Sequence, residues 1–196
     1  MIPALSNDRT TSSQAILGVL SLHPMTGYEI RQQITRSIGN FWTESFGQIY
    51  PTLKRLKQEG LVDVAPAKSS RKVYTLTADG RKHLESWLPV MPRPRVPRNE
   101  QLLKLFFGAL IPSGSMRAQV LETRKRYAAD LLRYEKIVTD VTRRAAGDPN
   151  LPFWLMTLSY GRTEARAIVS WCDETVAALD ELATAQVAKT KRKKVA

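Results

Sequence analysis

Residues 45–62 carry the pattern that most restricts what this chain can fold into. Ile49, Leu53 and Leu56 recur at spacings of four and three, which places them on one side of a helix. The opposite side and its borders carry small, amide, phenolic and cationic residues: Gly47, Tyr50, Pro51, Lys54, Arg55, Lys57 and Gln58. The segment therefore predicts a short amphipathic helix whose polar face suits either solvent or the major groove of DNA.

The residues after this helix predict a β-hairpin. Gly60 ends the helix. Residues 61–64 are rich in Val and alternate as strands do, and residues 73–76 predict a second strand. The segment between them, residues 65–72, favours turns and carries three cations: Lys68, Arg71 and Lys72. Hairpin tips are often basic only for solubility. A basic tip directly after a basic helix face favours contacts with phosphates or the minor groove.

Two further helices are predicted upstream. Residues 14–22 form an apolar run, preceded by three hydroxyl residues that can cap a helix: Thr11, Ser12 and Ser13. Thr26, with Glu29 three residues later, has the spacing of a capping box. It opens a second helix with the apolar residues Tyr28, Ile30, Ile34 and Ile38. The order of three helices and a hairpin predicts a winged helix-turn-helix, in which the third helix enters the major groove.

Residues from about 15 to 87 resemble the winged-helix domain of PadR-like transcriptional regulators. The segments that carry the resemblance are 16–20, 25–30, 47–56, 59–62 and 71–80. The resemblance implies a bacterial, cytoplasmic regulator that binds double-stranded DNA. In the longer PadR-like subfamily, a C-terminal helical domain dimerises the protein. Some members release DNA when phenolic acids or flat aromatic compounds bind.

The remainder of the chain predicts a second, helical domain. Four prolines in residues 89–98 exclude a continuing helix, and Asn99 is a candidate cap for the next one. Two long helices follow, over 116–141 and 151–182, with apolar residues at spacings of three, four or seven. Because such seams seldom stand alone, they predict a homodimer. The predicted interface residues are Leu102, Leu105, Phe106, Leu155, Leu158, Ile168, Trp171 and Leu179.

The predicted fold is mainly α with a small β-hairpin wing, as an N-terminal winged helix-turn-helix and a C-terminal long-helix dimerisation domain. The predicted domains are residues 1–10, disordered; 11–88, DNA-binding; 89–98, a proline-rich linker; 99–187, dimerisation; and 188–196, a basic tail. Two DNA-binding domains would bind a pseudo-palindromic operator with half-sites about one helical turn apart.

Specific residues are expected to contact DNA. Gln48 can read adenine, and Lys54 can read guanine or hold a phosphate. The free N–H groups at the start of the second helix can bind a phosphate. Tyr28 and Tyr50 suit DNA contact or core and hinge packing, and Pro51 predicts a distorted helix. The full predicted set is Thr26, Tyr28, Gly47, Gln48, Tyr50, Lys54, Lys57, Lys68, Arg71 and Lys72.

The formal charge of +12 does not locate the DNA site. Residues 1–88 hold 11 Lys and Arg against 7 Asp and Glu, a net +4, whereas the last eight residues alone add +5. Residues 191–194 resemble a nuclear localisation signal, but the bacterial character of the chain argues against that interpretation. A solvated terminus is the favoured interpretation of the tail, and non-specific phosphate contacts are the alternative.

Several function classes are disfavoured by composition. Two histidines and one cysteine, Cys172, leave few members for a catalytic triad or a zinc site. No phosphate-binding or dinucleotide-binding glycine pattern occurs, so no enzyme activity, cofactor or metal is expected. A single cysteine fits a reducing cytoplasm, and no apolar run approaches the roughly twenty residues that span a membrane. The alternative function is a helical scaffold or adaptor whose winged domain binds protein.

Aromatic residues near the predicted dimer interface raise the question of a small effector. The candidate residues are Phe153, Trp154, Tyr160 and Trp171. The resemblance implies that an aromatic compound can bind there and release DNA from a repressor. The sequence by itself favours the simpler interpretation that these side chains form the dimer core.

Overall fold

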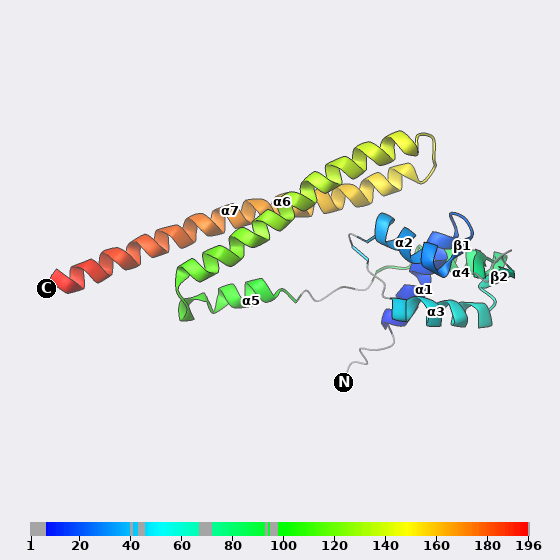
Figure 1. Cartoon of the computed structure of the whole chain (residues 1–196), viewed down its shortest axis with the longest axis horizontal. Coiled ribbons are helices and arrows are strands. Elements are labelled where there is room, and N and C mark those ends of the chain that lie inside the picture. The colour runs from blue at the N-terminus through cyan, green and yellow to red at the C-terminus, as the bar shows by residue number, and fades with distance from the viewer. Residues whose placement is uncertain are drawn as a thin grey trace. The chain divides into compact units, whose positions relative to one another are not determined.

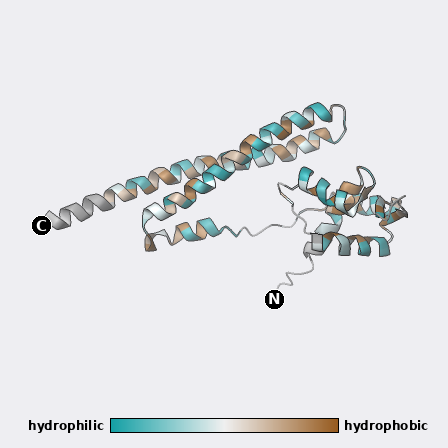
Figure 2. Ribbon diagram, viewed as in Figure 1, coloured by the Kyte–Doolittle hydropathy of each residue, from teal (hydrophilic) through white to brown (hydrophobic). Residues whose placement is uncertain are grey.

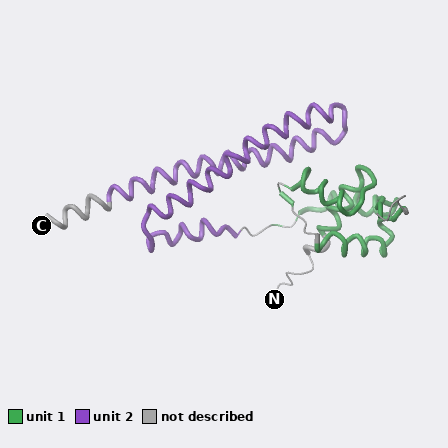
Figure 3. Tube along the Cα trace, in the orientation of Figure 1, with its two compact units in different colours: residues 1–94 green, residues 95–196 purple. Residues whose placement is uncertain are grey.

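The computed structural model describes residues 7–39, 41–42, 46–66, 72–92, 94 and 98–195 (Figure 1). Backbone contacts divide the chain into two compact units, Met1–Pro94 and Arg95–Ala196, coloured green and purple in Figure 3. The N-terminal unit contains helices and a small sheet, whereas the described part of the C-terminal unit is helical.

The N-terminal unit has the predicted order of helices and hairpin. Its elements are α1 (Asn7–Leu20), β1 (Met25–Thr26), α2 (Gly27–Ser37), α3 (Phe46–Gln58), β2 (Val62–Pro66), β3 (Lys72–Leu76) and α4 (Ala78–Trp87). The hairpin strands β2 and β3 pair antiparallel, with Val64 opposite Tyr74. On the other edge of β3, Met25 of β1 also lies opposite Tyr74, so the strand order is β1-β3-β2. The two-residue strand β1, which periodicity could not reveal, ties the start of α2 to the wing.

The core of this unit confirms the predicted apolar side of α3. Ile49, Leu53 and Leu56 are all 0% exposed, and they pack with apolar residues of α1, α2 and the sheet. Ile30 and Ile34 of α2 are also buried, but Tyr28, which the sequence placed on the same apolar side, is 54% exposed. Tyr28 is therefore a surface residue and not part of the core.

Helix α1 corrects two predictions. It begins at Asn7, so residues 7–10 are helical although they were predicted to be disordered; residues 1–6 lie outside the described part of the chain. Consequently Ser12 and Ser13 lie inside the helix, where they are buried, and do not cap it. The Ser13 hydroxyl instead accepts a hydrogen bond from the Arg55 guanidinium of α3.

The C-terminal unit is built on a long antiparallel helical hairpin. Its elements are α5 (Glu100–Phe106), the 3-10 turn η1 (Gly108–Leu110), α6 (Ser113–Arg144) and α7 (Leu151–Val195). Asn99 caps α5 as predicted, because its side-chain oxygen accepts a hydrogen bond from the Leu102 N–H at 3.1 Å. Figure 2 shows hydrophobic and hydrophilic residues alternating along α6 and α7, as expected for helices that each bury one side.

Ion pairs connect α6 to α7 at matching positions. Arg117 pairs with Asp180 at 2.7 Å, and Arg124 pairs with Asp173. The hydrogen bond from the Arg124 guanidinium holds the pKa of the Asp173 carboxyl below its usual range. Each pair is partly exposed and therefore contributes little stability. Because they recur after seven residues on both helices, they specify one register of the hairpin.

Several residues of the predicted dimer interface pack inside the hairpin of a single chain, and the dimer interface itself stays a prediction. Leu158 and Leu179 are buried between α6 and α7 of one chain, and three other predicted interface residues pack against the same clusters: Leu155, Ile168 and Trp171. The apolar seam of α7 is therefore largely covered within the chain. Leu105 also packs on this core, whereas Leu102 is 49% and Phe106 82% exposed.

Within the described residues, no helix is long and apolar enough to cross a membrane.

Candidate nucleic-acid interface

The outer face of α3 presents all five of its predicted DNA-contact residues to solvent. Gly47, Gln48, Tyr50, Lys54 and Lys57 are all exposed, while the opposite side of the helix is buried in the core. The helix runs without a break through Pro51, although this residue has no N–H to donate to the Gly47 carbonyl. The bend of α3 expected at Pro51 stays a prediction.

The start of α2 has the predicted capping box. The Thr26 hydroxyl accepts a hydrogen bond from the Glu29 N–H at 3.2 Å, and the Glu29 carboxylate accepts one from the Thr26 N–H at 2.7 Å. Next to this cap, the hydroxyl of Tyr28 accepts a hydrogen bond from the Gln32 amide at 2.7 Å. The phenol is thus held on the surface at the N-terminal end of α2, where the helix dipole favours an anion.

Gly27 lets α2 and α3 approach closely. A Cβ atom built on Gly27 would lie 2.6 Å from Cε1 of Tyr50, so the Tyr50 ring lies directly against the first turn of α2. The same ring is 50% exposed. One part of Tyr50 therefore packs at the helix junction and the other part faces solvent, and its contact with DNA stays a prediction.

Arg55 differs from its expected position. Helical spacing placed it on the outer face of α3, but it is only partly exposed and reaches back to Ser13 of α1. A hollow of about 480 Å³ lies beside it, lined by Ser12, Gly47, Gln48, Pro51, Thr52 and Arg55. Arg55 therefore connects α3 to α1, a role that sequence spacing did not indicate because the partner is 42 positions away.

The wing is described only at its strands. Lys72 begins β3, is exposed, and pairs in register with Pro66 at the end of β2. The other two predicted wing contacts, Lys68 and Arg71, lie outside the described residues. Among the described wing residues, Lys72 is therefore the cation available to a phosphate.

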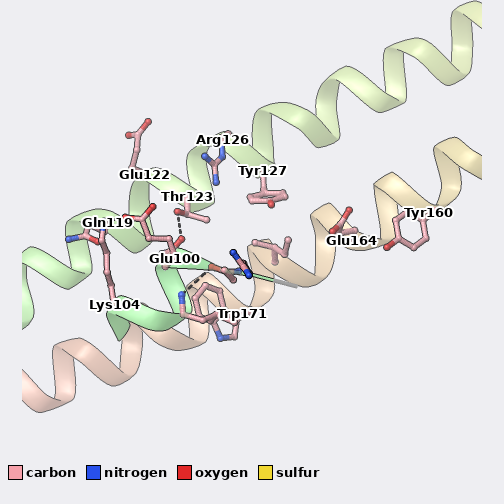
Figure 4. Close-up of a pocket in the computed structure, with 15 residues that line it drawn as sticks. Glu100, Lys104, Gln119, Glu122, Thr123, Arg126, Tyr127, Tyr160, Glu164 and Trp171 are labelled. Atoms are coloured by element: carbon pink, nitrogen blue, oxygen red, sulfur yellow. Dashed lines mark hydrogen bonds and ion pairs between the residues drawn. The ribbon is translucent and has the colours of Figure 1, made fainter. Parts of the chain in front are cut away.

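The predicted effector residues do not gather in one place. Tyr160 and Trp171 of α7 line an open groove of about 1,210 Å³ among α5, α6 and α7, together with Tyr127 of α6 (Figure 4). Phe153 and Trp154 are not among its lining residues, and Phe153 is 65% exposed. The charged residues that line the groove are balanced. Its cations are Arg98, Lys104 and Arg126, and its carboxylates are Glu100, Glu122 and Glu164. Lys104 pairs with Glu100 at 2.7 Å.

Comparison with known proteins identifies both units. Residues 16–86 match the model of the transcriptional regulator PadR-like family, and residues 97–180 match the C-terminal domain of virulence activator alpha. The chain is 29% identical to the negative transcriptional regulator PadR of Bacillus subtilis over 85% of this chain and 96% of that protein.

Solved structures agree with this assignment. The crystal structure of Bacillus subtilis PadR with operator DNA matches with a TM-score of 0.74 and 25% identity, over 85% of this chain and 98% of that one. The crystal structure of Bacillus subtilis PadR with p-coumaric acid matches with a TM-score of 0.73 and 25% identity, over 89% of this chain and 98% of that one. The Vibrio cholerae virulence activator AphA matches with a TM-score of 0.72 and 27% identity, over 87% of this chain and 99% of that one.

These relatives are transcriptional regulators, which confirms the expectation that the chain is not an enzyme. Three observations agree with the fold predicted from the sequence. They are the mostly helical fold with its small antiparallel sheet, the order of the winged-helix elements, and the two matched domains. The chain therefore belongs to the PadR-like family of transcriptional regulators, in the form that carries a C-terminal helical domain.

Proposed function

We propose that this protein is a dimeric, sequence-specific DNA-binding repressor. The observation that carries the proposal is the outer face of α3, whose amide, phenolic and cationic side chains are exposed while Ile49, Leu53 and Leu56 anchor the helix in the core. A rigid, polar helix of this kind fits the major groove. The relative PadR, solved with operator DNA, supports the assignment.

Each exposed group has a distinct proposed role. Gln48 and Lys54 contact base edges, because an amide can bind adenine and a cation can bind guanine in the major groove. Tyr50, held against Gly27, fixes the angle between α2 and α3. Lys57 and Lys72 bind backbone phosphates, as does the N-terminal end of α2 at Thr26 and Tyr28. Lys68, Arg71 and a close backbone approach at Gly47 complete the proposed interface.

A second copy of the chain is proposed to cover the apolar surface of α5 and η1. This surface consists of residues that are each 49% to 83% exposed: Leu102, Leu103, Phe106, Phe107 and Leu110. Soluble proteins rarely leave such contiguous side chains uncovered. We therefore assign residues 99–187 to dimerisation, 11–88 to DNA binding and 89–98 to the linker. The dimer would bind half-sites about 34–36 Å apart.

Lys54→Ala and Tyr50→Ala are expected to weaken operator binding strongly. Loss of the Lys54 base contact costs about 1–3 kcal/mol, which corresponds to roughly a 5- to 150-fold higher Kd per half-site. Loss of the Tyr50 ring removes the packing against Gly27 that orients α3, so binding should weaken there as well. Fluorescence anisotropy with DNA from upstream of the gene, in the presence of competitor DNA, measures the change. Lys82→Ala is the matched control, because Lys82 is an exposed cation of α4 in the same unit.

Sedimentation velocity should show the same dimer for all three variants. If both α3 variants bind the operator as tightly as the wild type, the assigned face is wrong. If the wild type shows no preference for any upstream DNA and instead binds a protein through its winged domain, the adaptor hypothesis replaces the repressor hypothesis.

A small aromatic acid is the proposed signal that releases DNA. The specific observation is the groove in the C-terminal unit, where Tyr160, Trp171 and Tyr127 offer aromatic surface and Arg126 offers a positive charge (Figure 4). A relative has been solved with p-coumaric acid, a compound of this chemical class. Phe153 and Trp154 are not included in this proposed site.

Titration with phenolic acids is expected to change the tryptophan fluorescence and to release operator DNA over the same concentration range. Trp171→Phe should remove the fluorescence change, because Trp171 lines the groove, whereas Trp154→Phe should retain it. A panel of aromatic acids that leaves both signals unchanged would count against ligand control. A response lost in Trp154→Phe but kept in Trp171→Phe would place the ligand elsewhere.

A further inference from the structure

Helix α7 is longer than the helix it packs against. It has 45 residues and α6 has 32, which at about 1.5 Å per residue makes α7 roughly 20 Å longer. The ion pairs of Arg117 with Asp180 and of Arg124 with Asp173 set the antiparallel register. In that register the first residue of α6, Ser113, lies across from about residue 184. Figure 1 shows α7 continuing past the start of α6 toward the C-terminus.

The part of α7 beyond this point has an unusual composition. We call residues 186–195 the α7 extension; the structure describes its backbone as helical. Residues 189–194 contain five Lys and Arg, no Asp or Glu, and no apolar residue. The preceding residues 151–188 contain 2 Lys and Arg against 5 Asp and Glu, a net −3. The sign of the charge therefore reverses where the helix passes the end of its partner.

This composition limits what the α7 extension can bind. Residues 189–194 have no apolar side chain, so this run cannot bury apolar surface against another protein or insert into a lipid bilayer as amphipathic helices do. Electrostatic attraction remains, and five charges spread over about 9 Å of helix match the charge density of double-stranded DNA, with one phosphate per about 1.7 Å. The match to the C-terminal domain ends at residue 180, so the α7 extension lies outside the matched residues.

We propose that the α7 extension is a second DNA contact, which binds the phosphate backbone without reading its sequence. It adds affinity for any duplex, raises the dependence of binding on salt, and leaves the choice of operator to α3. The proposal goes beyond the repressor function, because a phosphate contact of this kind requires that the full chain binds DNA but does not require that it represses a gene.

The test compares two variants of the full chain that each lose three positive charges. The tail variant carries Lys191→Gln, Arg192→Gln and Lys193→Gln. The matched control carries Lys125→Gln, Lys136→Gln and Arg144→Gln on the exposed surface of α6. Binding to duplex DNA of scrambled sequence is measured by anisotropy at several salt concentrations, and the slope of log K against log salt is the readout.

The tail variant is expected to lower the magnitude of this slope by about 2.7 per chain, because each lost phosphate contact removes about 0.9. When the salt is raised from 50 to 200 mM, the fold-loss of DNA affinity should therefore be about 40 times smaller for the tail variant than for the wild type. The α6 variant should keep the wild-type slope. The preference for operator over scrambled DNA should stay unchanged in the tail variant and fall in Lys54→Ala, so failure of the repressor hypothesis would be seen separately.

Equal slopes for wild type and tail variant would overturn the proposal, as would equal effects of the tail and α6 variants. A tail variant that keeps its slope but no longer forms the wild-type dimer would identify the α7 extension as an interface between copies. A tail variant that keeps its slope but loses binding to vesicles of anionic phospholipid would identify a membrane contact instead.

Discussion

Gly80→Ala is expected to destabilise the winged-helix unit by about 1–3 kcal/mol or more, the cost of overpacking a tightly packed site. A Cβ atom on Gly80 would lie 2.0 Å from the carbonyl oxygen of Leu61 and 2.8 Å from Cδ1 of Leu76. The first contact is with backbone, so a rotamer change cannot relieve it. Helix α4 would have to move away from the end of α3 and the start of β2.

Such a movement would also break the hydrogen bonds at the start of α4. The Thr77 hydroxyl accepts a hydrogen bond from the Gly80 N–H at 2.9 Å and donates one to the Gly60 carbonyl at 2.8 Å. The Thr77 N–H donates to the Leu61 carbonyl at 3.2 Å. Gly80 is thus required by a close approach between two backbone segments, and its own φ is ordinary for a helix.

Gly18→Ala is the matched control for this prediction. Gly18 also lies within a helix of the same unit, but a Cβ atom there would meet nothing within 4 Å. Alanine should be neutral or stabilise α1 by about 0.5–1 kcal/mol. Urea unfolding followed by circular dichroism measures both variants. A Gly80→Ala protein as stable as Gly18→Ala would show that α4 does not approach Leu61 as described.

Cys172 is expected to react with a thiol reagent at least about a hundredfold more slowly in the native protein than in the urea-unfolded chain. Its side chain is 0% exposed, in a cluster with Met116, Val120 and Leu179. Burial raises the pKa of the thiol, which lowers the fraction of reactive thiolate. Reaction therefore requires opening of the hairpin, and an opening free energy of about 3 kcal/mol slows it about a hundredfold.

Because Cys172 is the one cysteine of the chain, labelling with a chromogenic disulfide reagent reports on this position alone. The control is Ser170→Cys combined with Cys172→Ala, which moves the thiol to an exposed position of the same helix. This variant should react at nearly the rate of the unfolded chain. Similar native rates at the two positions would mean that the hairpin core is open in solution.

Local patterns in the sequence were sufficient wherever a feature depends on neighbours along the chain. The spacing of Ile49, Leu53 and Leu56 identified the buried side of α3, and Thr26 with Glu29 identified the cap of α2. Asn99 identified the start of α5 in the same way. These features are encoded by helical periodicity and by hydrogen bonds that reach only three or four residues, so they can be predicted without knowledge of the fold.

Features that depend on distant contacts could not be predicted in this way. Periodicity placed Arg55 on the outer face of α3, yet its guanidinium reaches Ser13 in a helix far earlier in the chain. A pattern shows that a side chain is apolar or charged, but not which partner it will meet.

The apolar seam of α7 shows this limit most clearly. The sequence by itself determined that α6 and α7 are long helices with an apolar side, that α3 is amphipathic with a polar outer face, and that the chain ends in a basic segment. Only the tertiary structure decided that Leu158 and Leu179 are buried against α6 of their own chain, leaving Phe106 exposed. The hydrophobic effect requires that apolar surface be buried, but it has no direction and does not specify the surface that covers it.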